Sequence, residues 1–139
     1  MTAALKAGTV YFAVVYAFGF VFGTVRVLVV MPLVGETVAV LFEAPIMLLV
    51  SWIAARWSAR TFSVPATLLP RIVMGAAAFA LLLLGELAVS TLVFGRSLAE
   101  TLVTYRSLPG LLGLSAQLIF ALLPLVQAIL LRRRSSTMG

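Results

Sequence analysis

The clearest signal in this 139-residue chain is a pattern of long apolar runs separated by short groups of polar residues. Four runs contain roughly 20 residues each, the length that an α-helix needs to cross the hydrocarbon core of a bilayer. They predict spanning helices at about residues 9–31, 37–55, 71–94 and 110–131. We therefore expect an all-α membrane protein, one antiparallel bundle of four transmembrane helices over residues 1–134. Residues 135–139 are expected to be a short disordered cytoplasmic tail.

The polar interruptions predict how these helices are joined. The segment Met31–Gly35 contains Pro and Gly and predicts a tight turn, so that the first two helices form a hairpin. Trp52 and Trp57 are typical of the membrane interface at the far end of the second helix. Between the third and fourth spans, Ser97 and Glu100 have the spacing of a capping box. Leu98, Leu102 and Tyr105 then fall on one face, which predicts a short amphipathic helix. This helix lies on the membrane surface, or its apolar face packs onto the bundle.

The composition requires a lipid environment and narrows the chemistry. Hydrophobic residues make up 63% of the chain and charged residues 10%, against about 45–50% and 25% in soluble domains. Asp, Asn, His and Cys are absent. Disulfides, thiolate nucleophiles and Cys/His sites for zinc or haem are therefore excluded. We expect no metal and no cofactor, and an enzyme is not the favoured interpretation.

The net charge of +6 is better explained by membrane topology and anionic lipid headgroups than by nucleic-acid binding, because the charged residues flank the apolar runs. Counting basic residues at the ends of the spans gives seven on one side and two on the other. The larger group is Lys6, Arg56, Arg60, Arg71, Arg132, Arg133 and Arg134, and the smaller is Arg96 and Arg106. The positive-inside rule then predicts that both termini are cytoplasmic. The Ala/Val/Leu/Arg-rich, Lys-poor composition points to a bacterial inner membrane.

Ionisable residues inside membrane spans are costly, so each one is a candidate functional residue. Three lie inside the predicted spans: Arg26, Glu43 and Glu86. A rise of 1.5 Å per residue places them, together with Gln117, roughly 11–14 Å below the outer surface. Each of the four helices thus contributes one polar side chain to the same layer, and Glu36 lies two turns above Glu43. The pattern predicts a ligand- or proton-binding site in the outer leaflet.

Small residues and a proline surround this polar layer. Gly19 and Gly23 form a G-x-x-x-G motif on the first helix, which lets another helix approach closely. Tyr16 lies on the same stripe and is a further candidate to line the site. Pro45 is inside the second helix and predicts a kink beside the carboxyl of that helix. Gly85 leaves room next to the carboxyl of the third helix.

The charged layer also has a purely structural interpretation. Arg26 and one of the two Glu residues could form an ion pair that only fixes the register of the helices. One such pair leaves a second carboxyl over, because the layer holds two carboxyls and one guanidinium. That carboxyl is expected to be neutral or to exchange a proton. This is the chemistry of proton-coupled transport, and it is also a way to avoid a buried charge.

Three functions are compatible with these features. We favour an oligomeric transporter or channel that uses the Arg/Glu/Glu cluster. An accessory or assembly subunit of a larger membrane complex would explain the small size and the lack of catalytic motifs. An intramembrane enzyme or binding protein for a lipid or quinone ranks third, because the chain has no His, Asp or Cys. The expected partners are the bilayer, further copies or a larger membrane complex, and a lipid or small-molecule ligand, with no nucleic acid.

Overall fold

Helices make up most of the chain in a computed structural model that describes residues 1–139. The elements are α1 Thr2–Val25, the π-helical turn η1 Arg26–Val30, α2 Met31–Val34, α3 Glu36–Thr61, α4 Leu68–Ala88, the π-helical turn η2 Val89–Val93, α5 Leu98–Thr104 and α6 Leu108–Thr137. Four continuous helical stretches are long and apolar enough to cross a membrane: Thr2–Val34, Glu36–Thr61, Leu68–Val93 and Leu108–Thr137. The all-α fold and the four helices of spanning length are therefore confirmed.

Each helix extends beyond the apolar run that predicted it. The first helix begins at Thr2, seven residues before the predicted span, and α6 continues to Thr137 through most of the segment expected to be a disordered tail. Hydropathy locates only the part of a helix that lies in hydrocarbon. The helical backbone continues into the interface until a cap or turn ends it. Arg134, in the last turn of α6, also interacts favourably with the C-terminal dipole of this helix.

The hairpin between α1 and α3 turns at a single residue. Gly35 has a φ of +86°, a conformation that glycine adopts readily because it has no Cβ. The rest of the segment predicted as a turn is helical and forms α2, which includes Pro32. The preceding turn is widened, and the backbone N–H of Met31 donates to the carbonyl of Arg26, five residues earlier. A proline that cannot donate to the carbonyl four residues before it accounts for this π-helical turn.

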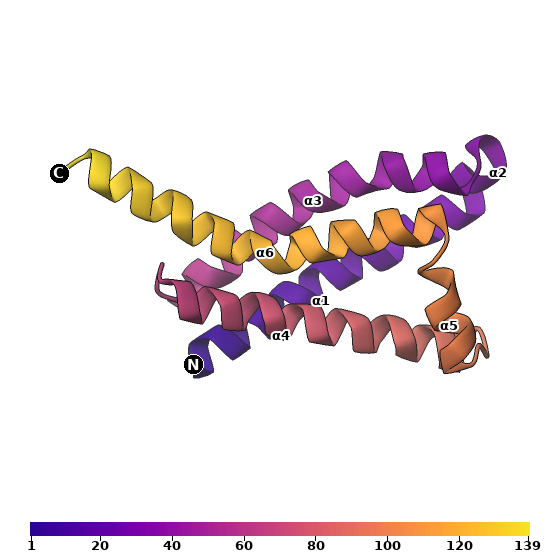
Figure 1. Cartoon of the computed structure of the whole chain (residues 1–139), viewed down its shortest axis with the longest axis horizontal. Helices are drawn as coiled ribbons and strands as arrows, with labels where there is room; N and C mark the ends of the chain where they lie inside the picture. The colour runs from indigo at the N-terminus through magenta and orange to yellow at the C-terminus, as the bar shows by residue number, and fades with distance from the viewer.

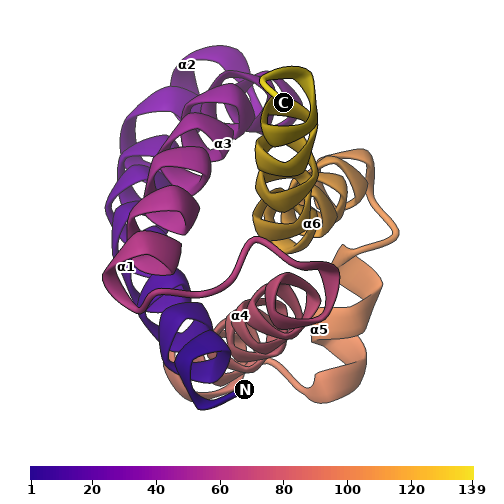
Figure 2. The same cartoon turned by 90° about the vertical axis from the view of Figure 1, so that its left-hand side faces the viewer.

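The four spanning helices form a ring in which each contacts two others. α1 packs against α3 and α4, and α6 packs against the same two helices. Figure 2 shows this ring from the end that carries both termini. Successive spanning helices run in opposite directions (Figure 1). α2 and α5 are both at the end away from the termini, on opposite sides of the bundle (Figures 1 and 2).

The buried core is confined to the half of the bundle that carries both termini, which we call the closed half. Its buried side chains come from all four helices: Ala4, Ala7, Tyr11 and Val15 of α1, Ser51, Ala54, Ala55, Ser58 and Ala59 of α3, Arg71, Met74, Ala78 and Leu82 of α4, and Phe120, Leu123, Gln127 and Ala128 of α6. In the other half, which we call the open half, only Ala39, Ser90 and Thr101 are buried. The bundle is therefore tightly packed at one end and loosely packed at the other.

Two glycines bring the helices of the closed half into backbone contact. A Cβ added to Gly8 would lie 2.6 Å from a carbonyl oxygen of α4, and one added to Gly75 would collide with the carbonyl of Ala121 in α6. Next to these contacts, the ring of Tyr11 stacks on Phe120 with the ring centroids 4.3 Å apart. Its hydroxyl donates to the carbonyl oxygen of Phe120 at 2.8 Å. These contacts close the interior of the bundle at this level.

Candidate functional site

Arg26 and Glu43 form the only ion pair of the chain, in the open half between η1 and α3. Arg26 is the first residue of the π-helical turn, and its Nε faces a carboxylate oxygen of Glu43. Isolated π-helical turns inside α-helices occur frequently at functional sites. Here the widened turn carries Arg26, which is the only arginine of the chain that pairs with a carboxylate.

A small pocket of about 110 Å³ lies beside this ion pair. Besides Arg26 and Glu43, its lining is apolar and consists of Phe22, Val25, Val30, Ala39, Phe42 and Ile46. The side chains of the pair are 27% and 19% exposed, and the neighbouring Phe42 is 66% exposed. The ion pair is therefore only partly enclosed by this chain.

Glu86, near the end of α4, accepts hydrogen bonds from two other segments. The hydroxyl of Tyr105 donates to its Oε2 at 2.8 Å, and Nε2 of Gln117 in α6 donates to its Oε1 at 2.5 Å. Each carboxylate oxygen thus has a neutral donor and no cationic partner. Arg26 forms no ion pair with Glu86, because its only carboxylate partner is Glu43. Glu86 is the carboxyl that the single arginine of the layer leaves over.

Tyr16 lies beside this carboxyl and connects α1 with α4. Its hydroxyl donates to the carbonyl oxygen of Gly85 at 3.1 Å. A Cβ on Gly85 would lie 3.1 Å from the Tyr16 ring, closer than most such contacts. The glycine therefore provides the space in which the ring packs one residue before Glu86.

The four polar residues of the predicted layer come together as two pairs. Arg26 contacts Glu43 across the α1–α3 contact, and Glu86 contacts Gln117 across the α4–α6 contact. No hydrogen bond or ion pair joins the two pairs directly. The arrangement follows from the ring of helices, because polar residues of packed neighbours meet first.

The remaining predicted residues lie outside these contacts. Glu36 is exposed in the first turn of α3. A Cβ on Gly19 would lie 3.5 Å from the methyl group of Met47, which is ordinary contact, and one on Gly23 would meet only a side chain of its own helix. The closest backbone approaches between spanning helices are elsewhere, at Gly8 and Gly75 in the closed half. α3 continues through Pro45 without a break.

The short helix α5 has the cap that its sequence predicts. The backbone N–H of Glu100 donates to Oγ of Ser97, and the backbone N–H of Ser97 donates to the Glu100 carboxylate, both at 3.2 Å. The capping box is therefore confirmed. A buried hydrogen bond of 2.7 Å between Ser90 and Thr101 then ties α5 to the end of the third span.

Tyr105 is the residue of the site that sequence analysis does not identify. It follows α5 directly and is half-buried against Glu86. Burial, and then the neighbouring Glu86 carboxylate, raise the pKa of the Tyr105 hydroxyl. Its position on the apolar face of α5 indicates contact with the bundle, but the spacing does not identify the partner.

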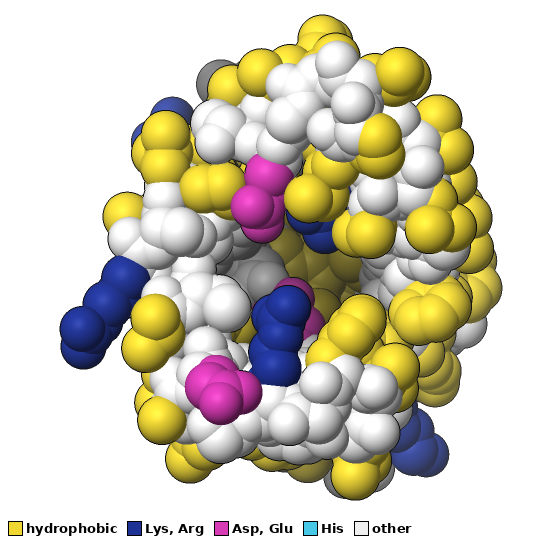
Figure 3. Space-filling model, turned by 90° about the vertical axis from the view of Figure 1, so that its right-hand side faces the viewer, with side chains coloured by type: hydrophobic (Ala, Val, Ile, Leu, Met, Phe, Trp, Pro, Cys, Tyr) yellow, Lys and Arg dark blue, Asp and Glu magenta, His cyan; other side chains and the backbone are white.

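Figure 3 shows the open end of the molecule as a hollow between the helices. Acidic and basic side chains lie at its rim and inside it, among apolar ones. No group of three carboxylate, His or Cys side chains could hold a metal ion. The arrangement is suited to binding or moving a charged species from the open end.

No protein-family model, curated protein or solved structure matches this chain. Its function therefore has to be inferred from the geometry of the site.

Proposed function

We propose that this protein is a membrane transporter that takes a small organic cation into the hollow of the open half in exchange for a proton on Glu86. The observation that carries the proposal is the contrast between the two halves of the bundle. A hollow with charged side chains opens at one end (Figure 3), and a packed core closes the other. Access from one side at a time is what an alternating-access transporter requires, whereas a channel needs a continuous path.

The charge balance of the hollow supports a cationic substrate. Glu43 is paired with Arg26, so that their charges offset each other. Glu86 has only neutral donors, Tyr105 and Gln117. An amide and a hydroxyl can remain bonded to this carboxyl in either protonation state, since each can also accept a hydrogen bond. Glu86 can thus hold a cation when ionised and a proton when the cation has left.

The orientation and assembly belong to the same proposal. Seven basic residues at the closed end, against two at the open end, support a cytoplasmic location of both termini. The hollow would then face the outside of a bacterial inner membrane, with α5 at the outer interface. The ion pair of Arg26 and Glu43 is only partly enclosed by one chain, which supports a homo-oligomer in which a second copy covers it.

The transport proposal is tested in liposomes that contain the purified protein and the pH dye pyranine. An inward gradient of guanidinium or methylammonium should make the lumen more alkaline as protons leave. Glu86→Gln retains the shape of the side chain and its hydrogen bonds but cannot be protonated and deprotonated. We expect its rate to fall to that of protein-free liposomes, at least tenfold below the native protein.

Glu100→Gln is the matched control, because it removes a carboxyl at the same end, and Gln also serves in a capping box. It should transport at the native rate. Circular dichroism and gel filtration establish that both variants are folded. The proposal is wrong if Glu86→Gln transports as fast as the native protein, or if the native protein moves none of the cations faster than empty liposomes.

A further inference from the structure

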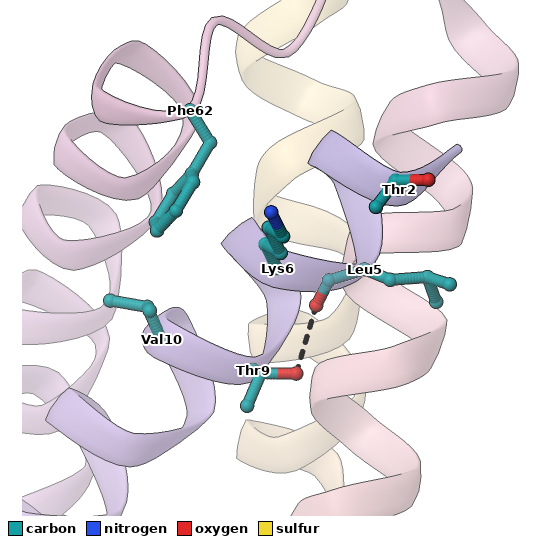
Figure 4. Close-up of a pocket in the computed structure, with 6 residues that line it drawn as sticks. All are labelled: Thr2, Leu5, Lys6, Thr9, Val10 and Phe62. Atoms are coloured by element: carbon teal, nitrogen blue, oxygen red, sulfur yellow. Dashed lines mark hydrogen bonds between the residues drawn. The ribbon is translucent and has the colours of Figure 1, made fainter.

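A second pocket lies at the opposite end, on the outside of the closed half. It has a volume of about 330 Å³, within the range of small ligand sites. Five of its residues, Thr2, Leu5, Lys6, Thr9 and Val10, come from the first turns of α1, and Phe62 reaches it from the end of α3 (Figure 4). The proposed transport does not use this pocket.

The lining combines one cation with an apolar wall. The hydroxyl of Thr9 is used within the helix, where it donates to the carbonyl oxygen of Leu5 at 2.9 Å. Lys6 is exposed and has no ion-pair partner, since the only ion pair of the chain is in the other half. Val10 and Phe62 supply apolar surface on one side of Lys6, and Leu5 lies on the other (Figure 4). The pocket thus presents an unpaired ammonium next to a hydrophobic groove.

The charge distribution of the molecule selects the sign of the ligand. All four carboxylates of the chain, Glu36, Glu43, Glu86 and Glu100, are in the open half or the connection beyond it. The closed end carries seven basic residues and no acidic one. The pocket therefore lies in a positive field with no internal counter-charge, and it attracts anions.

We propose that this pocket binds one anionic phospholipid, with the phosphate on Lys6 and an acyl chain along Val10 and Phe62. Ala4 and Ala7 are buried on the side of α1 that faces the core. The pocket is on the other side of α1. In the proposed orientation, with both termini cytoplasmic, the pocket lies beside the first spanning helix in the cytoplasmic leaflet. A Lys ammonium is a strong point-charge partner for a phosphate, and lipids with anionic headgroups are abundant on the cytoplasmic face of membranes.

Native mass spectrometry tests this site directly. The protein is extracted in detergent with equal amounts of phosphatidylglycerol and phosphatidylcholine, and the lipids that remain bound are counted. We expect one phosphatidylglycerol to be retained in preference to phosphatidylcholine. Lys6→Gln should lower this retention about fivefold, the effect of one basic residue at an anionic membrane surface. Val10→Trp fills the groove without changing the charge and should lower it as well.

Arg134→Gln is the matched control, because it removes the same charge at the same end but far from the pocket. It should leave the retained phosphatidylglycerol in place. The site is refuted if all basic variants reduce retention equally, if Val10→Trp has no effect, or if both lipids are retained to the same extent. Displacement by soluble glycerol phosphate would also overturn it, because the ligand would then be a free phosphate ester. Thermal unfolding in detergent distinguishes a lost site from a lost fold.

Discussion

The tightest backbone contact between two spanning helices, at Gly75, allows a stability prediction with a defined magnitude. In Gly75→Ala the added Cβ would lie 3.1 Å from the carbonyl carbon of Ala121 and closer still to its oxygen. Both atoms belong to the backbone of α6, so no side chain can rotate away. To regain van der Waals distance, α4 and α6 would have to separate by roughly 1 Å, which also weakens neighbouring contacts. Overpacking costs about 1–3 kcal/mol, and alanine regains up to about 1 kcal/mol of helix propensity. We expect a net loss of about 2 kcal/mol.

Reversible unfolding in mixed micelles of mild detergent and dodecyl sulfate, followed by far-UV circular dichroism, measures this loss. Gly113→Ala is the control, because a Cβ there meets nothing within 4 Å. It should be neutral or stabilise the protein by up to about 1 kcal/mol. The two variants are identical in chemistry and both lie in spanning helices. If Gly75→Ala is as stable as Gly113→Ala, the close approach of α4 and α6 is refuted.

Two further contacts give predictions of the same kind. Tyr105→Phe removes the hydrogen bond to Glu86 and should cost about 1 kcal/mol, measured as faster hydrogen exchange in α5. Burial and the Glu86 carboxylate raise the pKa of Tyr105 in the folded protein. The tyrosine of the unfolded chain therefore ionises first, and the native protein should lose stability as the pH rises above about 10. This loss should be smaller in Tyr105→Phe. Arg71 is 5% exposed and donates to two backbone carbonyls of the α3–α4 loop. Arg71→Gln should cost about 2 kcal/mol and speed proteolysis of that loop, whereas the exposed Arg60→Gln should stay within about 0.5 kcal/mol of the native protein.

The four helices could be predicted because a bilayer leaves the backbone few alternatives. Inside hydrocarbon every N–H and C=O must be bonded within the chain, so an apolar run of sufficient length must be helical. The cap of α5 was also predictable, since Ser97 and Glu100 interact within one turn. The ends of the helices were harder to predict from the sequence, because they depend on caps at the interface and on Pro32. The effect of Pro32 on the preceding turn can be seen only once the backbone path is known.

The site could be located by depth but not by pairing. The fixed rise of a helix places Arg26 and Glu43 at the same level, and the structure brings them into contact. Which residues meet also depends on the rotation and tilt of each helix, which spacing alone does not determine. For the same reason a G-x-x-x-G motif did not identify the closest backbone approaches between spanning helices, which occur at Gly8 and Gly75. Tyr105 reaches Glu86 only because α5 folds back on the third span.

The two halves of the bundle are physically linked through the cost of burying charge. Ionised groups such as Arg26 and Glu86 would be destabilising in a dry, tightly packed interior, so a half that contains them is best left open to water. A loosely packed half contributes little to stability, and the bundle must then be held together elsewhere. The closed half meets this need with small side chains and with Gly8 and Gly75, which bring the helices into backbone contact. It follows that stability and the proposed transport should be separable. Substitutions at Gly75 should lower the free energy of unfolding and leave the charged residues of the hollow unchanged. Glu86→Gln should abolish the proposed transport with little change in the free energy of unfolding.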